Sequence, residues 1–305
     1  MTASGPNENR RAVIDIGSNS VKLLVADVVD GVVTPLVHES EQTRLGRGVF
    51  ETGLLEQEAV LETTRVASHF ADRARDAGAE EIRVLGTSAA RDAHNAVDLA
   101  RALAAENLAL EILDGHAEAG LVLRGVRSHP DLAAGRLALM DVGGGSTELL
   151  VADGQDLKLA RSFQLGTVRL LSGHPTADDK AKLTDTLGSF LDEKLVPALG
   201  RVSLPGMLVG TGGTPVFLAR VLKETDNIAS AELESTRLSL SEVQTLNARL
   251  WAMPLEQRRR LPGLPANRAD VILIGSAIYE AVMLRCGFAE LRPTLRGVRY
   301  GALLA

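Results

Sequence analysis

Cysteine is almost absent from this sequence. Of its 305 residues only Cys286 carries a thiol, which excludes an intramolecular disulfide framework and a cysteine-rich zinc site. A single thiol fits a reducing compartment, so we expect a cytoplasmic location. Hydrophobic residues make up 45% of the chain and charged residues 24%, which are ordinary values for a folded protein and exclude extensive disorder. The length suits two domains of ordinary size.

A long apolar run is also missing. The first eleven residues, MTASGPNENRR, are polar and contain no apolar signal core. The longest uncharged stretch, residues 202–219, has 18 residues but contains four glycines and two prolines. That composition suits a strand, a turn and a helix better than a membrane span, so we expect neither a targeting segment nor a membrane partner.

Lysine is scarce and the net charge is negative. The chain has 33 basic and 39 acidic residues, a net charge of −6, and 27 of the basic residues are arginine. The arginine excess has two interpretations, GC-rich coding or recognition of phosphate by guanidinium groups. Charge is uneven, because residues 1–125 carry −8 and residues 126–305 carry +2. The total excludes an extended basic track, so we expect no nucleic-acid partner, but local phosphate sites remain compatible with it.

An internal repeat organises the chain. The segment DIGSNSVKLLVAD at 15–27 aligns with DVGGGSTELLVAD at 141–153, and eight of thirteen positions are identical. The offset of 126 residues is far larger than a solenoid repeat and indicates duplicated domains. We expect a first domain over 1–125, joined by a last helix over 298–305, and a second domain over 126–305.

Each copy of the repeat has the pattern of a β-hairpin with a tight turn. Small residues at such a turn allow backbone N–H groups to surround an anion. Two ordinary hairpin turns are the alternative, but two matching copies favour phosphate binding. The candidate phosphate-binding residues are Gly17, Ser18, Asn19 and Ser20 in the first copy and Gly143, Gly144, Gly145, Ser146 and Thr147 in the second.

The rest of each half alternates strands with helices, which is typical of α/β layers. Strands are predicted over 81–86, 108–113 and 205–210, and helices over 54–77, 88–106, 117–128, 178–196 and 268–286. Ser239 and Glu242 form a capping-box pattern that opens one more helix.

Three junctions in this pattern could carry chemistry. Gly212 and Gly213 lie in GTGGT between a strand and a helix, where backbone amides can hold phosphate, or where the chain simply turns tightly. Arg91 follows a strand by one helical turn, at the sheet edge where ligands gather, or pairs with Asp92 or Asn95 at the surface. Glu118 is a candidate general base, or a carboxylate that only complements the helix dipole.

A basic group near the end of the sequence has two interpretations as well. Its side chains could hold an anion or could form an ordinary solvated face. The group consists of Arg268, Arg292, Arg296 and Arg299.

Ordered motifs over nearly the whole chain connect these features to a known family. They are DIGSNS at 15–20, TSAARDA at 87–93, EAGLV at 118–122, DVGGGSTEL at 141–149, LGTVRL at 165–170, GTGGT at 210–214, NRADVILIGSAI at 267–278 and LRGVRYGALL at 295–304. With them the sequence resembles the exopolyphosphatase and guanosine pentaphosphate phosphatase (Ppx/GppA) family, in its short two-domain form. The resemblance implies duplicated ribonuclease-H-like α/β domains of the sugar kinase, Hsp70 and actin superfamily, with an interdomain cleft.

The same resemblance implies an activity and roles for residues. The expected enzyme is an exopolyphosphatase that releases terminal orthophosphate from inorganic polyphosphate by metal-assisted attack of water. Glu118 would be the base, Arg91 would contact the terminal phosphoryl group, and the glycine-rich turns would hold phosphates. Mg²⁺, with Mn²⁺ as a second candidate, would be placed by Asp141 and Glu148, with Asp15 joining through water. A homodimer is expected too.

Two details come from comparing this sequence with itself and with the family. Lys22 aligns with Glu148 across the repeat, so we predict that Lys22 holds substrate phosphate while Glu148 acts on metal and water. Longer family members have an added C-terminal helical region that is absent after Ala305, which predicts a preference for shorter polyphosphate chains. Gly120 stands where members often carry a larger residue.

Other functions stay open from the sequence alone. One is a guanosine pentaphosphate 5′-phosphohydrolase, and another is a non-catalytic sensor of guanosine tetraphosphate or pentaphosphate. A third is a kinase or ATPase of the same superfamily, which would need an aspartate base and an adenine pocket around residues 210–214. The glutamate at 118 argues against a kinase, which would need an aspartate base. Glu118 together with Glu148 argues against a non-catalytic sensor.

Overall fold

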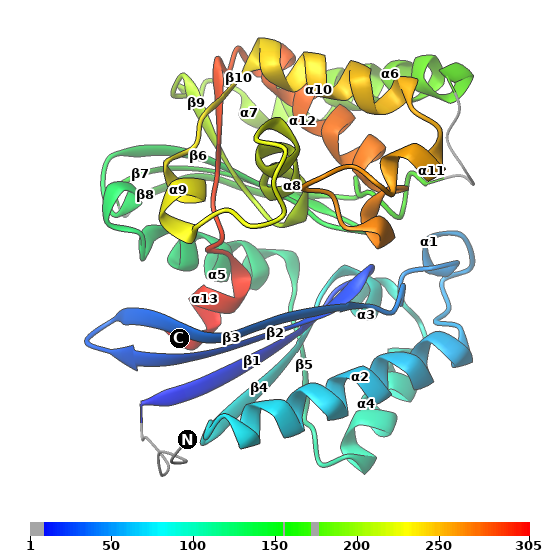
Figure 1. Cartoon of the computed structure of the whole chain (residues 1–305), viewed down its shortest axis with the longest axis vertical. Helices are drawn as coiled ribbons and strands as arrows, with labels where there is room; N and C mark the ends of the chain where they lie inside the picture. Colours follow the sequence, from blue (N-terminus) through cyan, green and yellow to red (C-terminus); the bar gives the residue numbers. More distant parts are fainter. Residues whose placement is uncertain (1–8, 155, 172–176) are drawn as a thin grey trace. The chain divides into compact units, whose positions relative to one another are not determined.

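A computed structural model describes residues 9–154, 156–171 and 177–305 of the chain. Contacts divide it into two compact units (Figure 1). The first unit runs to Ala133 and also includes Gly143–Gly145 and Arg296–Ala305, and the second consists of Ala134–Val142 and Ser146–Leu295. The division predicted after residue 125 falls inside helix α5 (Gly115–Arg127), which belongs whole to the first unit.

The first unit is built on a five-stranded sheet with the order β3-β2-β1-β4-β5. Strands β1 and β2 form an antiparallel hairpin, and β1 is parallel to β4 on its other side. In Figure 1 the long helix α2 runs beside this sheet, where its apolar face meets the buried side of β1 and β2. The strands are β1 (Arg10–Ile16), β2 (Ser20–Val29), β3 (Val32–Gln42), β4 (Glu81–Gly86) and β5 (Leu110–Ile112). Besides α5, the helices are α1 (Val49–Thr52), α2 (Gln57–Asp76), α3 (Ser88–Asp92), α4 (Ala96–Ala105) and α13 (Val298–Leu303).

The second unit has a six-stranded sheet with the order β10-β11-β9-β6-β7-β8. Its apolar core is formed by the sheet and by helices that include the fully buried α12 residue Tyr279. The strands are β6 (Arg136–Val142), β7 (Thr147–Asp153), β8 (Asp156–Phe163), β9 (Met207–Thr211), β10 (Leu238–Ser239) and β11 (Glu290–Pro293). The helices are α6 (Ala177–Phe190), α7 (Val196–Leu199), α8 (Gly213–Leu222), α9 (Ser230–Ser235), α10 (Leu240–Ala252), α11 (Leu255–Arg258) and α12 (Ile272–Cys286).

The two sheets are copies of one design. The order β8-β7-β6-β9-β11 repeats β3-β2-β1-β4-β5, with the same antiparallel and parallel neighbours. Each copy also has a β-bulge at the same place, after Val25 in one and after Val151 in the other, at the offset of the sequence repeat. A bulge kept at one position is a built feature of a sheet and not an accident of pairing. The predicted fold class, duplicated ribonuclease-H-like α/β domains, is confirmed.

Two of the predicted helices have different bounds in the structure. The single helix over 88–106 is wrong, because α3 and α4 are separated at residues 93–95. The side chain of Asn95 accepts from Leu55 N (2.7 Å) and donates to Leu55 O (3.1 Å), which stabilises the break. The predicted end at residue 196 is wrong as well, because α6 continues through a π-helical turn, Leu191–Leu195, into α7. In that turn Val196 N donates to Leu191 O, which shifts the hydrogen-bond register directly before Pro197.

The four arginines of the basic C-terminal group do not form one solvated face. Arg292 is buried in the second unit and donates to the Glu234 carbonyl at 3.0 Å. In the first unit Arg296 donates to Ser128 O at 2.5 Å, and Arg299 donates to Leu23 O at 3.0 Å. These three guanidinium groups therefore satisfy main-chain carbonyls, which is a structural role.

Helix α13 is fastened to the first unit by arginines from other elements. Arg11 donates to Leu303 O (3.0 Å), Arg83 to Ala302 O (2.9 Å) and Arg124 to Leu304 O (3.4 Å). Cations at the last carbonyls of a helix satisfy those groups and complement the helix dipole.

In the described part of the chain no helix is both long and apolar enough to cross a bilayer.

Candidate functional site

The first glycine-rich turn joins β1 to β2. Asp15 and Lys22 are directly opposite each other in the antiparallel pair, so their side chains project from the same face of the sheet. Gly17 N donates to Ser20 O at 3.0 Å and closes the turn. The hydroxyl groups of Ser18 and Ser20 are buried and have no hydrogen-bond partner among the described residues. Buried hydroxyls without a partner need a ligand or water, which fits a turn that receives phosphate oxygens.

A neighbouring segment holds this turn in shape. Arg44 N donates to Asn19 O at 3.1 Å and Gly46 N donates to Ser18 O at 2.7 Å. The side chain of Gln42 donates to Asn19 Oδ1 at 3.0 Å. The turn is therefore organised before any ligand arrives, and a preorganised site loses less conformational entropy on binding.

Glu118 and Arg91 meet within the first unit. Arg91 Nη1 donates to Glu118 Oε2 at 2.7 Å and to the Leu113 carbonyl at 3.0 Å. The side chains are 12% exposed for Glu118 and 21% for Arg91. The surface alternative for Arg91 is weaker, because its nearest approach to Asp92 is 3.9 Å. The ion pair orients both groups, which are the base and the phosphoryl contact that the family resemblance implies.

The start of helix α5 sets the position of Glu118. Asp114 is the N-cap, and its carboxylate accepts from His116 N (2.9 Å) and Ala117 N (2.8 Å). Glu118 follows in the first turn, with its own N–H bonded to Asp114 O at 2.9 Å. The sequence prediction started this helix at residue 117 and so did not identify the cap.

The cap makes the stability of α5 depend on pH. The two backbone N–H groups lower the pKa of Asp114 from its usual 3.8. Its stabilising effect is therefore present above the unfolded pKa and is lost as the pH falls through the lower folded pKa. We expect Asp114→Ala to lower Tm near neutral pH and this difference to disappear below the folded pKa. Asp114→Asn, which keeps a capping oxygen, is the control, and thermal unfolding across pH is the measurement. An equal Tm for wild type and Asp114→Ala at neutral pH would contradict this role.

The tip of the second glycine-rich turn, Gly143–Gly145, is counted with the first unit by its contacts. A Cβ at Gly145 would overlap Ser88 Oγ and the ring of Phe50. Only glycine can come this close to the start of α3, the helix that carries Arg91. The structure thus places Gly145 of the second turn against Ser88 and Phe50.

In the second unit Asp141 and Glu148 are the counterparts of Asp15 and Lys22. They are directly opposite each other across β6 and β7, so both carboxylates project from one face of the sheet. Glu148 is 2% exposed, and Ser162 Oγ donates to its Oε1 at 2.7 Å. Thr147 donates its hydroxyl to Leu165 O at 2.6 Å, and Ser146 is buried beside it.

The start of α8 lies against Asp141. Gly212 has a φ of +88°, and a Cβ there would lie 2.8 Å from Asp141 Oδ1. Glycine is therefore required by both the backbone conformation and the carboxylate, and Gly213 follows as the first residue of α8. The buried hydroxyl of Tyr279 stabilises the neighbouring backbone, because it lies 3.0 Å from Met140 O and 3.2 Å from Thr211 O. Burial, and then the charge of Asp141, raise the pKa of Tyr279 well above its usual 10, so it stays a neutral phenol.

The donor set of this corner suits magnesium. Mg²⁺ prefers oxygen ligands and usually takes one or two carboxylates, with phosphate oxygens and water completing the shell. Asp141 and Glu148 provide two carboxylates on one face, and the described residues contain no cluster of three or more acidic, histidine or cysteine ligands. Asp15 lies in the first unit opposite a lysine, and the metal roles of all three carboxylates stay predictions.

Residues that the sequence reasoning missed have supporting roles. Asp114 could have been found from its position after a strand and before a helical pattern. Ser88 and Tyr279 could not, because their contacts to Gly145 and Met140 join segments far apart in the sequence.

Comparisons with known proteins agree with the fold and with the motifs. The chain is 32% identical over 289 residues to exopolyphosphatase 2 of Mycobacterium tuberculosis, with 89% of each chain covered. It is 30% identical over 276 residues to a guanosine-5′-triphosphate,3′-diphosphate pyrophosphatase of Vibrio cholerae, covering 89% of this chain and 54% of that one. The crystal structure of an exopolyphosphatase from Cytophaga hutchinsonii superimposes with a TM-score of 0.87 at 26% identity, covering 96% of both chains.

The family comparison covers all the site residues except those before residue 24, which are Asp15, the first turn and Lys22. The model described as the Ppx/GppA phosphatase family matches residues 24–305. With that match and the identities above, this chain belongs to the Ppx/GppA phosphatase family.

Proposed function

We propose that this protein is a magnesium-dependent exopolyphosphatase, which releases terminal orthophosphate from inorganic polyphosphate. The observation that carries the proposal is the 2.7 Å pair of Arg91 and Glu118, in a unit whose first glycine-rich turn holds the buried hydroxyl groups of Ser18 and Ser20, unpartnered among the described residues. Relatives named exopolyphosphatase support the substrate class, and one named guanosine-5′-triphosphate,3′-diphosphate pyrophosphatase supports guanosine pentaphosphate as the second candidate. Both reactions cleave a phosphoanhydride bond.

In the proposed reaction water attacks the terminal phosphorus and the bridging P–O bond breaks. Glu118 takes a proton from the water, and the water oxygen thereby becomes a better nucleophile. Arg91 neutralises charge on the terminal phosphoryl oxygens, and the backbone N–H groups and serine hydroxyls of residues 17–20 hold phosphate oxygens. The bridging oxygen leaves with the shortened chain, and orthophosphate is the product. Mg²⁺, or Mn²⁺ in its place, would be held by Asp141 and Glu148 and would supply positive charge against the phosphate oxygens.

A side-by-side assay decides between the substrates. The purified protein is incubated with Mg²⁺ and either polyphosphate or guanosine pentaphosphate, and released orthophosphate is measured. We expect release from polyphosphate without any nucleotide, with the larger kcat/KM of the two substrates. Release only from guanosine pentaphosphate would establish the second candidate, and binding without release would establish a sensor. Polyphosphates of graded length in the same assay test the predicted preference for shorter chains.

Lys22 offers a test of substrate binding. The lysine projects beside Asp15 from the strand that follows the first turn, where an ammonium group can meet substrate phosphate. We expect Lys22→Ala to raise the KM for polyphosphate about tenfold, on the order of one charge-assisted contact. Lys223→Ala, which removes a surface lysine paired with Glu232 in the second unit, is the control. An unchanged KM in Lys22→Ala would refute the role.

Two further expectations stay predictions. The homodimer would be checked by analytical ultracentrifugation of the purified chain. The cytoplasmic location would be checked by fractionation of cells that produce it.

A further inference from the structure

A pair of opposite charges recurs in both copies of the repeat. Arg10 is opposite Asp27 across β1 and β2, and Arg136 is opposite Asp153 across β6 and β7, at the same offset of 126 residues. Both pairs lie at the end of the hairpin away from the glycine-rich turns. Because the strands and the pair are duplicated, the first copy serves as an internal reference for the second.

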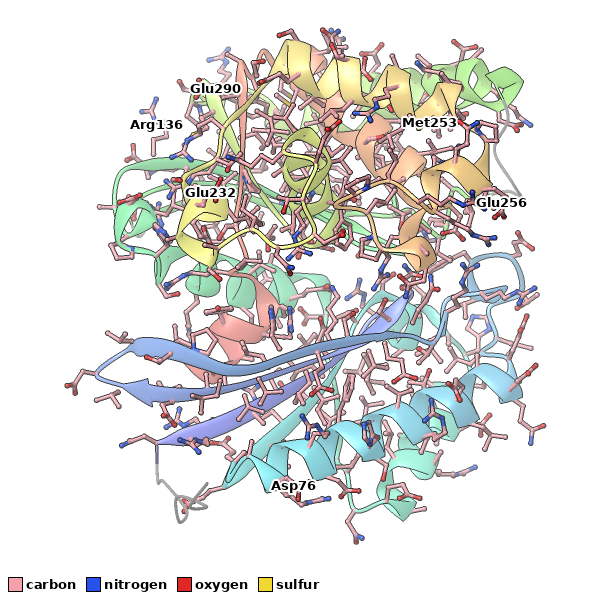
Figure 2. All side chains as sticks on the ribbon, viewed as in Figure 1. Asp76, Arg136, Glu232, Met253, Glu256 and Glu290 are labelled. Carbon is pink, nitrogen blue, oxygen red and sulfur yellow. The ribbon has the colours of Figure 1, made fainter. Side chains whose placement is uncertain are left out.

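The two pairs differ in how they are covered. In the first unit Arg10 makes two hydrogen bonds to Asp27 (2.8 and 3.2 Å) and a third to Ala77 O (2.8 Å), just after helix α2. Those side chains are only 14% and 25% exposed. In the second unit Arg136 approaches Asp153 only to 3.5 Å, and the side chains are 49% and 48% exposed. The second copy is therefore open, and Figure 2 shows Arg136 at the periphery of its unit.

The loop after the covering helix explains the difference. In the first unit residues 77–80 lead directly from α2 into β4 and cover the arginine. In the second unit the longer segment 200–206 separates α7 from β9. Ser203 of that segment accepts from Arg136 Nη1 at 3.1 Å, and Arg201 has no ion-pair partner within the described part of the chain.

The opening leaves a pocket of about 400 Å³ that is lined mainly by basic and apolar residues. Arg136, Lys158 and Arg201 line it together with one acid, Asp153. Lys158 comes from the β-bulge of β8 and also pairs with Asp156 at 3.1 Å. Of the pocket's apolar lining residues Val202 is half-buried, whereas Val151 and Ala152 are each only 1% exposed and offer almost no surface.

We propose that this pocket binds a small organic phosphate of nucleoside monophosphate size, separately from the catalytic residues. Three cations that line one pocket suit a phosphate dianion, and guanidinium groups bind phosphate oxygens in a fixed geometry. The half-buried Val202 provides an apolar surface that the body of such a ligand can contact, and the volume is in the range of small-ligand pockets. The first unit has no counterpart, because Ala77 and α2 close the equivalent position.

Guanosine monophosphate and inorganic phosphate are the probes, titrated calorimetrically into the full chain. We expect guanosine monophosphate to bind at least tenfold more tightly than inorganic phosphate, and the double variant Lys158→Ala with Arg201→Ala to lose about tenfold in affinity. The same double variant should hydrolyse polyphosphate as the wild type does. Lys223→Ala with Arg249→Ala, which removes two cations elsewhere in the second unit, should bind like the wild type.

The outcomes separate this site from the proposed catalytic one. Lys22→Ala should keep the affinity for guanosine monophosphate. If that variant loses the binding while the Lys158 and Arg201 variant keeps it, the nucleotide occupies the catalytic residues and the proposal is overturned. Equal affinity for guanosine monophosphate and inorganic phosphate would overturn it too, because contacts with the nucleoside part of the ligand would then contribute nothing.

Discussion

Glu118→Gln is expected to lower kcat for orthophosphate release by about 10²- to 10⁴-fold, the usual contribution of a general base. The glutamine keeps the size of the side chain and an oxygen that can accept from Arg91, so the 2.7 Å contact has a neutral equivalent. It cannot take a proton from water at neutral pH. Steady-state kinetics on polyphosphate with saturating Mg²⁺ would measure the effect, with KM changing little because binding contacts are retained.

Glu111→Gln is the matched control for this prediction. Glu111 is also an acid of the first unit paired with an arginine, at 2.8 Å from Arg83, but it is 50% exposed and lies on β5. Its replacement should leave kcat unchanged. A Glu118→Gln enzyme with wild-type kcat would show that the water is activated by another group, while loss of activity in both variants would point to a general structural defect.

The hairpin repeat is the part of the site that could be predicted from the sequence. The repeated segments 15–27 and 141–153 identified both turns because a hairpin is a local structure, specified by the residues within it. They also predicted that Lys22 and Glu148 occupy equivalent places, and the registers Asp15 with Lys22 and Asp141 with Glu148 confirm this. The signals for Arg91 and Glu118 were local too, since both follow strand ends.

Long-range contacts were beyond prediction from local patterns. The pairing of Arg91 with Glu118 joins residues 27 apart, and nothing in either segment specifies the partner. The break at Asn95 depends on Leu55, a residue 40 positions earlier, so the helical pattern alone favoured one continuous helix. Such tertiary contacts override local propensity because a buried polar group must find its partner wherever the fold provides one.

Composition alone also did not reveal what many of the arginines do. Phosphate recognition and GC-rich coding were the two interpretations, and the structure adds a third use. Arg11, Arg83 and Arg124 donate to the last carbonyls of α13, and Arg258 is buried with its guanidinium on the Ala269 carbonyl at 2.9 Å. Burial lowers the pKa of Arg258, although its usual value is high enough for it to stay charged.

The contact of α13 with α5 leads to the largest expected effect on stability. In Figure 1 the two helices lie together in the first unit, and glycines let their backbones touch. A Cβ at Gly301 would overlap the Leu121 carbonyl, and one at Gly125 would lie 2.9 Å from Gly301 N. Both neighbours are main chain and cannot turn away as a side chain would, so the helices must separate.

Gly301→Ala is therefore expected to lower the free energy of unfolding by about 1–3 kcal/mol or more, the usual cost of overpacking. Because α5 carries Glu118 near its start, kcat should fall along with Tm. Gly120→Ala is the control in the same helix, since nothing lies within 4 Å of its Cβ position. That variant should be stabilised by up to about 1 kcal/mol from helix propensity and should keep its activity. Thermal and urea unfolding of the two variants provides the comparison, and equal stabilities would mean that α13 does not hold α5 in place.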